Sequence, residues 1–376
     1  MRRIAVLALG AALLAACTSV PAPGSLPPPE WPVAGVPDDN APLPPPMQRA
    51  KSRWVPVRWA ELPGFEQDDT AQAWNAWLKN CERPGPALAP LCGQVRLLAL
   101  ATPEEQRAWL RTRLQPYRVE PQGGAAGDGL LTGYFEPLVD AARQPQGAYA
   151  TPLYRPPATL NQRRPWYTRQ EIDTLPDARA QLQGQEIVWL ADPLDALILQ
   201  IQGSGRVRIA EPDGSQRMAR LAYAGDNGQP YRSVGRWLLD QGLIRDSTWP
   251  GIKAWAAANP QRLQDLLWSN PRVVFFREEP LAEPDAQFGP RGAQGVPLTP
   301  GRSIAVDPQS IPYGTPVWLS SPGPLLALDR LVLAQDTGSA ITGALRADYF
   351  AGWGAQAGEV AGRLRQPLRL WVLWPK

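Results

Sequence analysis

The chain has 376 residues, 44% of them hydrophobic, which is enough to bury one large core or two moderate ones, so two domains are expected. Its 38 basic and 35 acidic residues are mixed along the chain and leave a formal net charge of +3, so no basic stripe indicates a nucleic-acid partner. Because the chain contains no histidine, Ser-His-Asp and Cys-His catalysis and the usual zinc-hydrolase ligand sets are excluded, which leaves carboxylates as the leading candidates for proton transfer.

The N-terminus has the pattern of an export signal. A basic start at Met1-Arg2-Arg3 precedes an apolar run from Ile4 to Ala16 that is too short to span a bilayer as a helix. We therefore expect residues 1–16 to be a signal peptide that is removed. The run ends in Leu14-Ala15-Ala16-Cys17, which resembles the bacterial lipobox and predicts a lipid on Cys17. The alternative is an ordinary signal peptide cleaved beside an incidental cysteine.

Residues 17–47 should form a lipidated, proline-rich linker. Between Cys17 and Met47 the chain has 11 prolines, which favour an extended spacer between the membrane and the folded body. Thr18, and not Asp, follows the cysteine, which resembles an outer-membrane sorting signal. The expected location is the outer membrane, with the protein facing the periplasm.

The remaining cysteines are Cys81 and Cys92. An exported, oxidising location makes a short-loop disulfide between them plausible, and two separate buried thiols are the alternative.

Two helices are expected early in the folded part, at Asp68–Asn80 and Pro103–Leu114, the second beginning in a capping box of Thr102 and Glu105. Short apolar runs between Gly and Pro then predict a mostly β middle region. Its expected strands are Leu130–Phe135, Glu186–Leu190, Ala196–Gln202, Val207–Ala210 and Arg272–Phe276.

Helical spacing returns at Ser233–Gln241 and Gln261–Trp268. The last strands are expected at Val317–Leu319, Leu331–Ala334 and Leu368–Trp374. Gly203-Ser204-Gly205 lies between two alternating runs and predicts a hairpin turn, not a phosphate loop.

Three segments hold more specific polar residues than strands and turns require. Thr132–Pro137 puts an aromatic and a carboxylate at a strand end, and Gln200 and Gln202 share one face of the expected strand before Ser204. Such amide and hydroxyl groups suit a neutral, hydroxyl-rich ligand, although an exposed polar strand face explains the glutamines equally well.

The third segment runs from Leu331 into Asp336-Thr337-Gly338. A carboxyl group at the mouth of a buried strand is poorly solvated, which raises its pKa and lets it hold a proton to donate. An aspartate that merely ends a strand by bonding turn amides is the alternative.

The chain resembles the family of membrane-bound lytic murein transglycosylase A, with its C-terminal three-aspartate domain. Seven stretches recur in order over roughly residues 50–376. They are Leu131–Pro137, Asp195–Gly205, Asn227–Arg236, Val274–Arg277, Val296–Asp307, Ile311–Thr315, and Ala334–Gly343 with Asp348. Ser339 stands where the family more usually has glycine.

The resemblance implies a mainly β fold with few flanking helices. Residues 48–137 plus 278–376 would form a double-psi β-barrel catalytic domain, and residues 138–277 an inserted, smaller β-rich domain that binds glycan. The expected reaction is cleavage of the β-1,4 bond between N-acetylmuramic acid and N-acetylglucosamine of peptidoglycan, with formation of 1,6-anhydromuramic acid, in cell-wall turnover and remodelling.

By motif position, the resemblance makes Asp336 the catalytic acid and Asp307 and Asp348 its companions. Either companion could orient Asp336 or raise its pKa, but holding loops together by accepting amide hydrogen bonds is the favoured role. The implied glycan contacts are Thr132, Gly133, Tyr134, Gln202, Ser204 and Gly205. No metal or organic cofactor is implied, and the expected partners are peptidoglycan strands, the membrane through the lipid anchor, and cell-wall synthesis or remodelling complexes.

Two rival functions remain open from the sequence. Asp336-Thr337-Gly338-Ser339 also spells the signature of an aspartic protease, but such an enzyme needs two such aspartates and only one copy occurs. The other rival is an envelope lipoprotein that binds peptidoglycan without cutting it.

Overall fold

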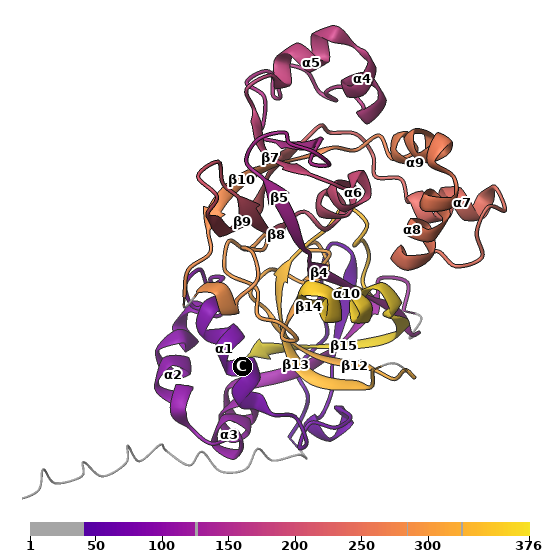
Figure 1. Cartoon of the computed structure of the whole chain (residues 1–376). Coiled ribbons are helices and arrows are strands. Elements are labelled where there is room, and N and C mark those ends of the chain that lie inside the picture. Colours follow the sequence, from indigo (N-terminus) through magenta and orange to yellow (C-terminus); the bar gives the residue numbers. More distant parts are fainter. Residues whose placement is uncertain (1–40, 125–126, 284, 325) are drawn as a thin grey trace, which may run out of the picture. The chain divides into compact units, whose positions relative to one another are not determined.

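Two β-sheets organise the part of the chain that the structure, a computed structural model, describes: residues 41–124, 127–283, 285–324 and 326–376 (Figure 1). The expected signal peptide, Cys17 and most of the proline-rich linker lie outside these residues. Within them, no helix is both long enough and apolar enough to cross a membrane.

The larger sheet closes into a barrel. Its strand order is β1-β2-β3-β15-β12-β13-β11-β14-β4, and β15 also pairs with β4, so the six strands from β15 to β4 form a ring. The mainly β barrel fold expected from the sequence is therefore confirmed. The strands are β1 (Met47–Gln48), β2 (Ser52–Pro56), β3 (Leu114–Pro121), β4 (Gly129–Glu136), β11 (Ser303–Val306), β12 (Pro316–Ser321), β13 (Leu328–Asp336), β14 (Arg346–Trp353) and β15 (Arg365–Pro375).

Strand β13 is buried on both faces, which explains its unbroken apolar run. Val332 and Ala334 belong to the barrel core, while Leu331 and Leu333 on the opposite face are also fully buried. Helices pack around the barrel, with α1 against β13 (Figure 1). These helices and 3₁₀ turns are η1 (Trp59–Glu61), α1 (Thr70–Asn80), η2 (Ala89–Leu91), α2 (Cys92–Leu97), η3 (Leu98–Leu100), α3 (Pro103–Arg113) and α10 (Gly354–Arg363).

The ends of α1 and α3 follow their capping residues. Asp69 caps α1 through the amide of Ala71, so the helix begins at Thr70, two residues after the expected start. The predicted capping box of Thr102 and Glu105 at the start of α3 is confirmed.

The second sheet lies wholly between residues 138 and 280, with the order β10-β9-β8-β5-β7-β6. Its strands are β5 (Leu138–Ala142), β6 (Thr151–Tyr154), β7 (Glu186–Leu190), β8 (Gly205–Ala210), β9 (Gln216–Asp226) and β10 (Val274–Pro280). More helix accompanies it than the sequence indicated. The helical segments are α4 (Arg169–Thr174), α5 (Pro176–Leu182), α6 (Pro193–Gln202), α7 (Val234–Asp240), α8 (Trp249–Ala258), η4 (Pro260–Arg262) and α9 (Leu263–Trp268), with η5 (Asp285–Gln287) after the sheet.

The strand expected at Ala196–Gln202 is wrong, because these residues form the second half of α6. Asp192 caps this helix through the amide of Leu194, and Pro193 occupies its first turn. Gly203 ends it in the left-handed conformation, with φ of +80°. The predicted hairpin turn is therefore a helix C-cap. A helix buried on most sides is apolar nearly all round, and a short apolar run of that kind resembles a buried strand.

A buried charge cluster lies where the second sheet joins the barrel. Glu136 ends β4 and is fully buried, and its carboxylate accepts hydrogen bonds from Arg206 on β8 at 2.8 Å and from Arg220 on β9 at 2.6 Å. The two arginines are cross-strand neighbours and both donate to the carbonyl of Phe288. Arg206 also lies over the ring of Trp353 at 3.9 Å. This Glu136 cluster ties β4, the second sheet and the returning chain together.

A disulfide joins Cys81 to Cys92, with a Cα–Cα distance of 5.6 Å. It links the residue after the end of α1 to the first residue of α2.

Candidate active site

The register of four neighbouring barrel strands brings the site residues into one row. Ala305 on β11 is the partner of Asp336 on β13 and, on its other side, of Asp348 on β14. Asp348 in turn is the partner of Thr132 on β4. Residues separated by up to 216 positions in sequence thus lie across one edge of the barrel, which makes a shared polar site possible.

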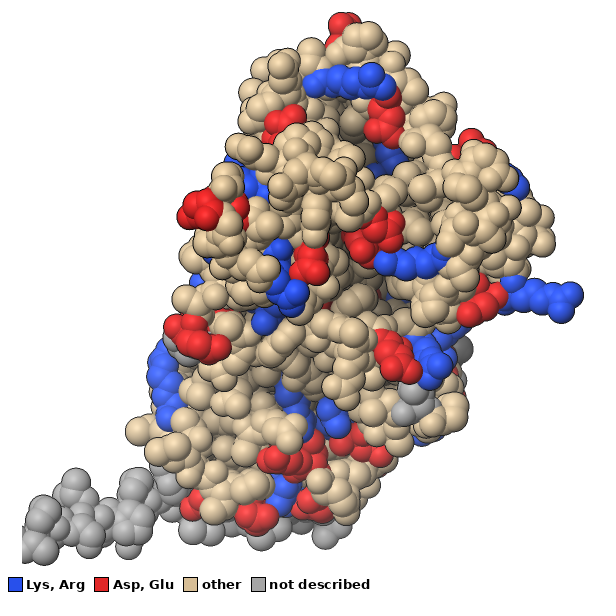
Figure 2. Space-filling view, in the orientation of Figure 1, with Lys and Arg blue, Asp and Glu red and all other residues tan. Residues whose placement is uncertain are grey.

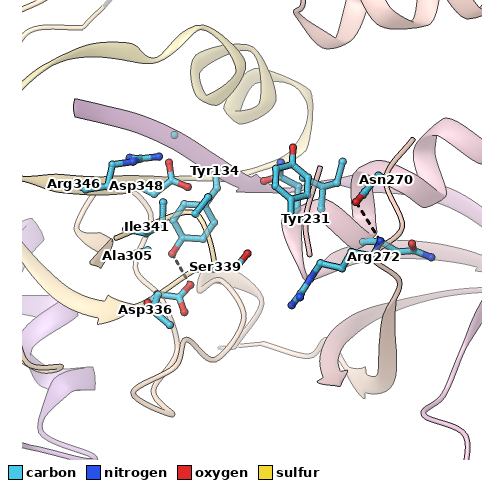
Figure 3. Close-up of a pocket in the computed structure, with 17 residues that line it drawn as sticks. Tyr134, Tyr231, Asn270, Arg272, Ala305, Asp336, Ser339, Ile341, Arg346 and Asp348 are labelled. Atoms are coloured by element: carbon cyan, nitrogen blue, oxygen red, sulfur yellow. Dashed lines mark hydrogen bonds between the residues drawn. The ribbon is translucent and has the colours of Figure 1, made fainter. Parts of the chain in front are cut away.

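Asp336 is held at both carboxylate oxygens. The amide of Ala293 donates to Oδ1 at 2.9 Å. The phenol of Tyr134 donates to Oδ2, also at 2.9 Å (Figure 3). Burial raises the pKa of Asp336 above its ordinary value, although the hydrogen bonds from the amides of Ala293 and Thr337 and from Tyr134 oppose the rise. Burial and the neighbouring carboxylate raise the pKa of Tyr134 well above 10, so the phenol keeps its proton.

Asp348 lies beside this pair in a separate chain of hydrogen bonds. Arg346 donates to the hydroxyl of Thr132 at 2.8 Å, and that hydroxyl donates to Asp348. Burial raises the pKa of Asp348 to about 6, against the opposing effects of the Thr132 hydrogen bond and the charge of Arg346. The side chain is therefore only partly ionised near pH 6.

This raised pKa predicts a pH-dependent loss of stability. A carboxyl whose folded pKa is about 6, against an ordinary 3.8, favours folding most at low pH, and this contribution is lost as the pH rises through 6. Solvent screening of the partly exposed side chain reduces the effect of the raised pKa. Relative to Asp348→Asn, the wild type should therefore lose on the order of 2 kcal/mol of unfolding free energy between pH 4 and pH 7. Urea unfolding of both proteins at the two pH values measures this, and parallel pH dependences would show that the assigned pKa is wrong.

A cavity of about 280 Å³ opens over the row. On the barrel side it is lined by Gly133, Tyr134, Ala305, residues 336–341, Arg346 and Asp348. On the other side the lining comes from the second-sheet region: Gln200, Ile201, Gln202, Tyr231, Asn270 and Arg272 (Figure 3). Hydroxyl, amide and charged groups thus face one space from both parts of the chain, as a hydroxyl-rich ligand requires.

Part of the expected glycan set lines this cavity. Gly133, Tyr134 and Gln202 do, whereas Thr132 is not among the lining residues and donates a hydrogen bond to Asp348. At Gly133 a Cβ would lie 2.8 Å from the Cα of Ala361, so only glycine allows α10 to approach β4 this closely.

Ser204 and Gly205 are buried and are not among the described residues that line the cavity. The expected shared strand face of Gln200 and Gln202 is also wrong, because both lie on α6. Gln202 accepts a hydrogen bond from the amide of Phe135, while Gln200 accepts one from Arg169.

Asp307 is not among the residues lining the cavity. Its carboxylate accepts hydrogen bonds from the amides of Gly343 and Gln309 and from the ammonium of Lys51. These contacts hold the pKa of Asp307 below its ordinary value, even though burial opposes them. The contacts match the loop-holding role favoured from the sequence.

Several site residues were not singled out from the sequence. Tyr231 and Arg346 stood within or beside the quoted motifs, whereas Asn270 and Arg272 had no local signal. Ala293 acts through its backbone amide, which no side-chain pattern reveals.

On the face drawn in Figure 2, acidic and basic side chains are interspersed, without a large area of one sign.

Comparison with protein families gives two matches. Residues 130–277 match the MltA specific insert domain, and residues 302–374 match the 3D domain.

Individual proteins match over longer stretches. The membrane-bound lytic murein transglycosylase A of Vibrio cholerae is 33% identical over 263 residues, which is 67% of each chain. Among solved structures, the lytic transglycosylase LtgG of Burkholderia pseudomallei is 44% identical, with a TM-score of 0.61, over 89% of this chain and 99% of that one. MltA from Neisseria gonorrhoeae is 27% identical, with a TM-score of 0.73, over 89% and 96% of the two chains.

Proposed function

Because this chain belongs to the family of membrane-bound lytic murein transglycosylase A and is a peptidoglycan lytic transglycosylase, we propose that Asp336 is its single acid/base group. The observation that carries the proposal is the environment of its carboxyl, which is enclosed, has a raised pKa and faces the cavity. Asp348, the other carboxyl group that lines the cavity, accepts a hydrogen bond from the hydroxyl of Thr132.

In the first step, Asp336 donates its proton to the oxygen that links N-acetylmuramic acid to N-acetylglucosamine. Each carboxyl oxygen accepts one hydrogen bond, Oδ1 from the Ala293 amide and Oδ2 from Tyr134, so each keeps a second lone pair that can carry the proton. A raised pKa keeps a larger fraction of Asp336 protonated near neutral pH, which is what a general acid needs.

In the second step, the C6 hydroxyl of the same muramic acid attacks C1, and the ionised Asp336 takes the hydroxyl proton. An intramolecular nucleophile has a high effective concentration, so no second carboxylate is needed to activate water. The C1–O bond to the leaving sugar breaks, the C1–O6 bond forms, and Asp336 ends protonated for the next cycle. The product is a 1,6-anhydromuramic acid end.

We assign glycan contacts to Gly133, Tyr134 and Gln202, which line the cavity. Thr132 is assigned a supporting role through Asp348, and Ser204 and Gly205 are assigned to fixing the chain as it leaves α6. In this assignment residues 48–137 plus 278–376 form the catalytic domain, and residues 138–277 form a glycan-binding insert across the cavity.

The proposal also covers lipidation and location, which depend on the N-terminal segment. We assign a lipid to Cys17 and place the protein on the outer membrane, facing the periplasm, where the proline-rich linker lets the catalytic part reach the cell wall and its remodelling complexes. Mass spectrometry of the mature N-terminus tests the lipid, and an unmodified Cys17 would contradict this assignment.

Incubation of the purified protein with peptidoglycan sacculi tests the proposed chemistry. Soluble muropeptides with anhydro ends are expected from the wild type and not from Asp336→Asn. Equal release by the two proteins would remove Asp336 from the mechanism.

A further inference from the structure

A short turn carries the amide that bonds Asp336. In the segment 291–296, the amide of Gly292 donates to the carbonyl of Val296, and the amide of Gln294 donates to the carbonyl of Gln335. The segment therefore lies against the end of β13. A Cβ at Gly292 would lie 2.4 Å from the carbonyl oxygen of Gln335, so glycine is needed for this approach. The turn thereby brings the Ala293 amide to Oδ1 of Asp336.

Two amide side chains, of which Gln294 is partly buried and Asn80 fully buried, fix this turn to the end of α1. The Nε2 of Gln294 donates to Oδ1 of Asn80 at 2.6 Å and to the carbonyl of Arg83 at 3.0 Å. Asn80 is fully buried, and its Nδ2 donates to the carbonyl of Gly314 at 2.9 Å. Because the Cys81–Cys92 disulfide follows directly, the end of α1 is a fixed point for these contacts.

The hydrogen bonds that Nε2 donates set the orientation of the Gln294 amide group. Its Oε1 is buried and has no hydrogen-bond partner among the described residues, whereas its Nε2 makes both contacts. An unpaired buried carbonyl costs free energy, so the observed orientation indicates that the link to Asn80 outweighs this cost.

Helix α1 also holds the other partner of the Ala293–Asp336 hydrogen bond. The residue before Asp336, Gln335, is fully buried, and its Nε2 donates to the carbonyl of Ala76 at 3.1 Å. The donor and the acceptor of the hydrogen bond are thus both fixed to one helix. None of Asn80, Gln294 and Gln335 is among the residues that line the cavity.

We propose that Asn80 and Gln294 are positioning residues for the reaction, which hold the Ala293 amide on Oδ1 of Asp336 from outside the cavity. This inference rests on the proposed acid/base role of Asp336. It assigns the two residues an influence on proton transfer without contact with the glycan.

The expected signature is a change in the ionisation of Asp336. The amide stabilises the carboxylate, so its loss should raise the pKa of Asp336. Activity depends on protonated Asp336 and falls as the pH rises through this pKa, so the alkaline limb of the pH profile should move to higher pH. The charged or titratable groups facing Asp336 are Tyr134 from β4, Arg346 and Asp348 from β14, Tyr313 from the loop before β12, and Arg272 across the cavity. All of them are retained in the variants below.

The test compares Gln294→Met with Gln106→Met in the full-length protein. Gln106 is likewise a glutamine with two side-chain hydrogen bonds, and it is fully buried. It accepts a hydrogen bond from Thr70 at the other end of α1 and donates one to the carbonyl of Leu98. Asn80→Ala serves as the second variant. The titration of Asp336 is followed by ¹³C NMR of labelled aspartate carboxyls, with Asp336→Asn identifying the signal, and kcat and KM are measured against pH on solubilised glycan strands.

Gln294→Met and Asn80→Ala should raise the titration midpoint of Asp336 by on the order of half a pH unit. Because the carboxyl is held less firmly, they should also lower the plateau value of kcat, measured at pH values below the midpoint, about threefold to tenfold, with KM within about twofold. Gln106→Met should lower thermal stability without either change. The inference is overturned if the midpoint stays in place in both variants, or if Gln106→Met moves it equally. A midpoint shift in a protein whose wild type makes no anhydro product would instead overturn the proposed function and leave the hydrogen-bond network as described.

Discussion

Replacing Asp336 by Asn should lower the rate of anhydromuropeptide formation about a thousandfold, because a positioned general acid and base contributes factors of this order. The side-chain oxygen of Asn can still accept the hydrogen bond from the Ala293 amide, but the Asn side chain cannot transfer a proton. The loss should therefore appear in kcat, while binding to sacculi and the thermal unfolding midpoint change little. Initial rates, a sacculus co-sedimentation assay and thermal unfolding measure the three quantities.

Asp329→Asn is the matched control, since Asp329 lies on the same strand β13 and is exposed. It should retain wild-type activity. Activity of Asp336→Asn within about tenfold of the wild type would show that another group supplies the proton.

Replacing Glu136 by Gln should lower the unfolding free energy by about 3 to 5 kcal/mol. The substitution leaves Arg206 and Arg220 buried side by side without a carboxylate between them. The NH₂ group of the new glutamine also faces the N–H groups of the arginines, and donors cannot bond to donors. Urea unfolding measures the change.

The control is Glu359→Gln, which breaks an exposed pair with Arg363 on α10 and should cost less than about 1 kcal/mol. If Glu136→Gln costs no more than this control, the Glu136 cluster does not stabilise the junction of β4 and the second sheet.

The sequence predicted the barrel strands β4, β12, β13 and β15 from their apolar runs, and it missed β1, β2, β3, β11 and β14. It also predicted helices whose caps are local. The start of α3, set by Thr102 and Glu105, is an example. The motif around Asp336 was visible because a polar residue follows a strand that is buried on both faces.

What the sequence could not provide depends on contacts between distant residues. Helix α6 resembled a strand because its neighbours bury both its faces. The row of Asp336, Ala305, Asp348 and Thr132 follows from strand register, and the pairing of Glu136 with Arg206 and Arg220 from the junction of two sheets. No local pattern encodes such pairings.

One alternative mechanism uses the same cavity. Strand β11 lies between the strands that carry Asp348 and Asp336. With a pKa of about 6, Asp348 could act as a base that activates water, as the second carboxylate of an inverting glycosidase does. The hydrogen bond from Thr132 and the nearby Arg346 favour a fixed supporting role instead. The two mechanisms differ in the atom that attacks C1.

The most direct test is mass spectrometry of the products formed from peptidoglycan in ¹⁸O-labelled water. If the C6 hydroxyl of muramic acid is the nucleophile, the new ends should be 1,6-anhydro sugars that carry no ¹⁸O, and Asp336→Asn should release none. Reducing ends that carry ¹⁸O would show that water attacks C1 and would contradict the mechanism with a single carboxylate.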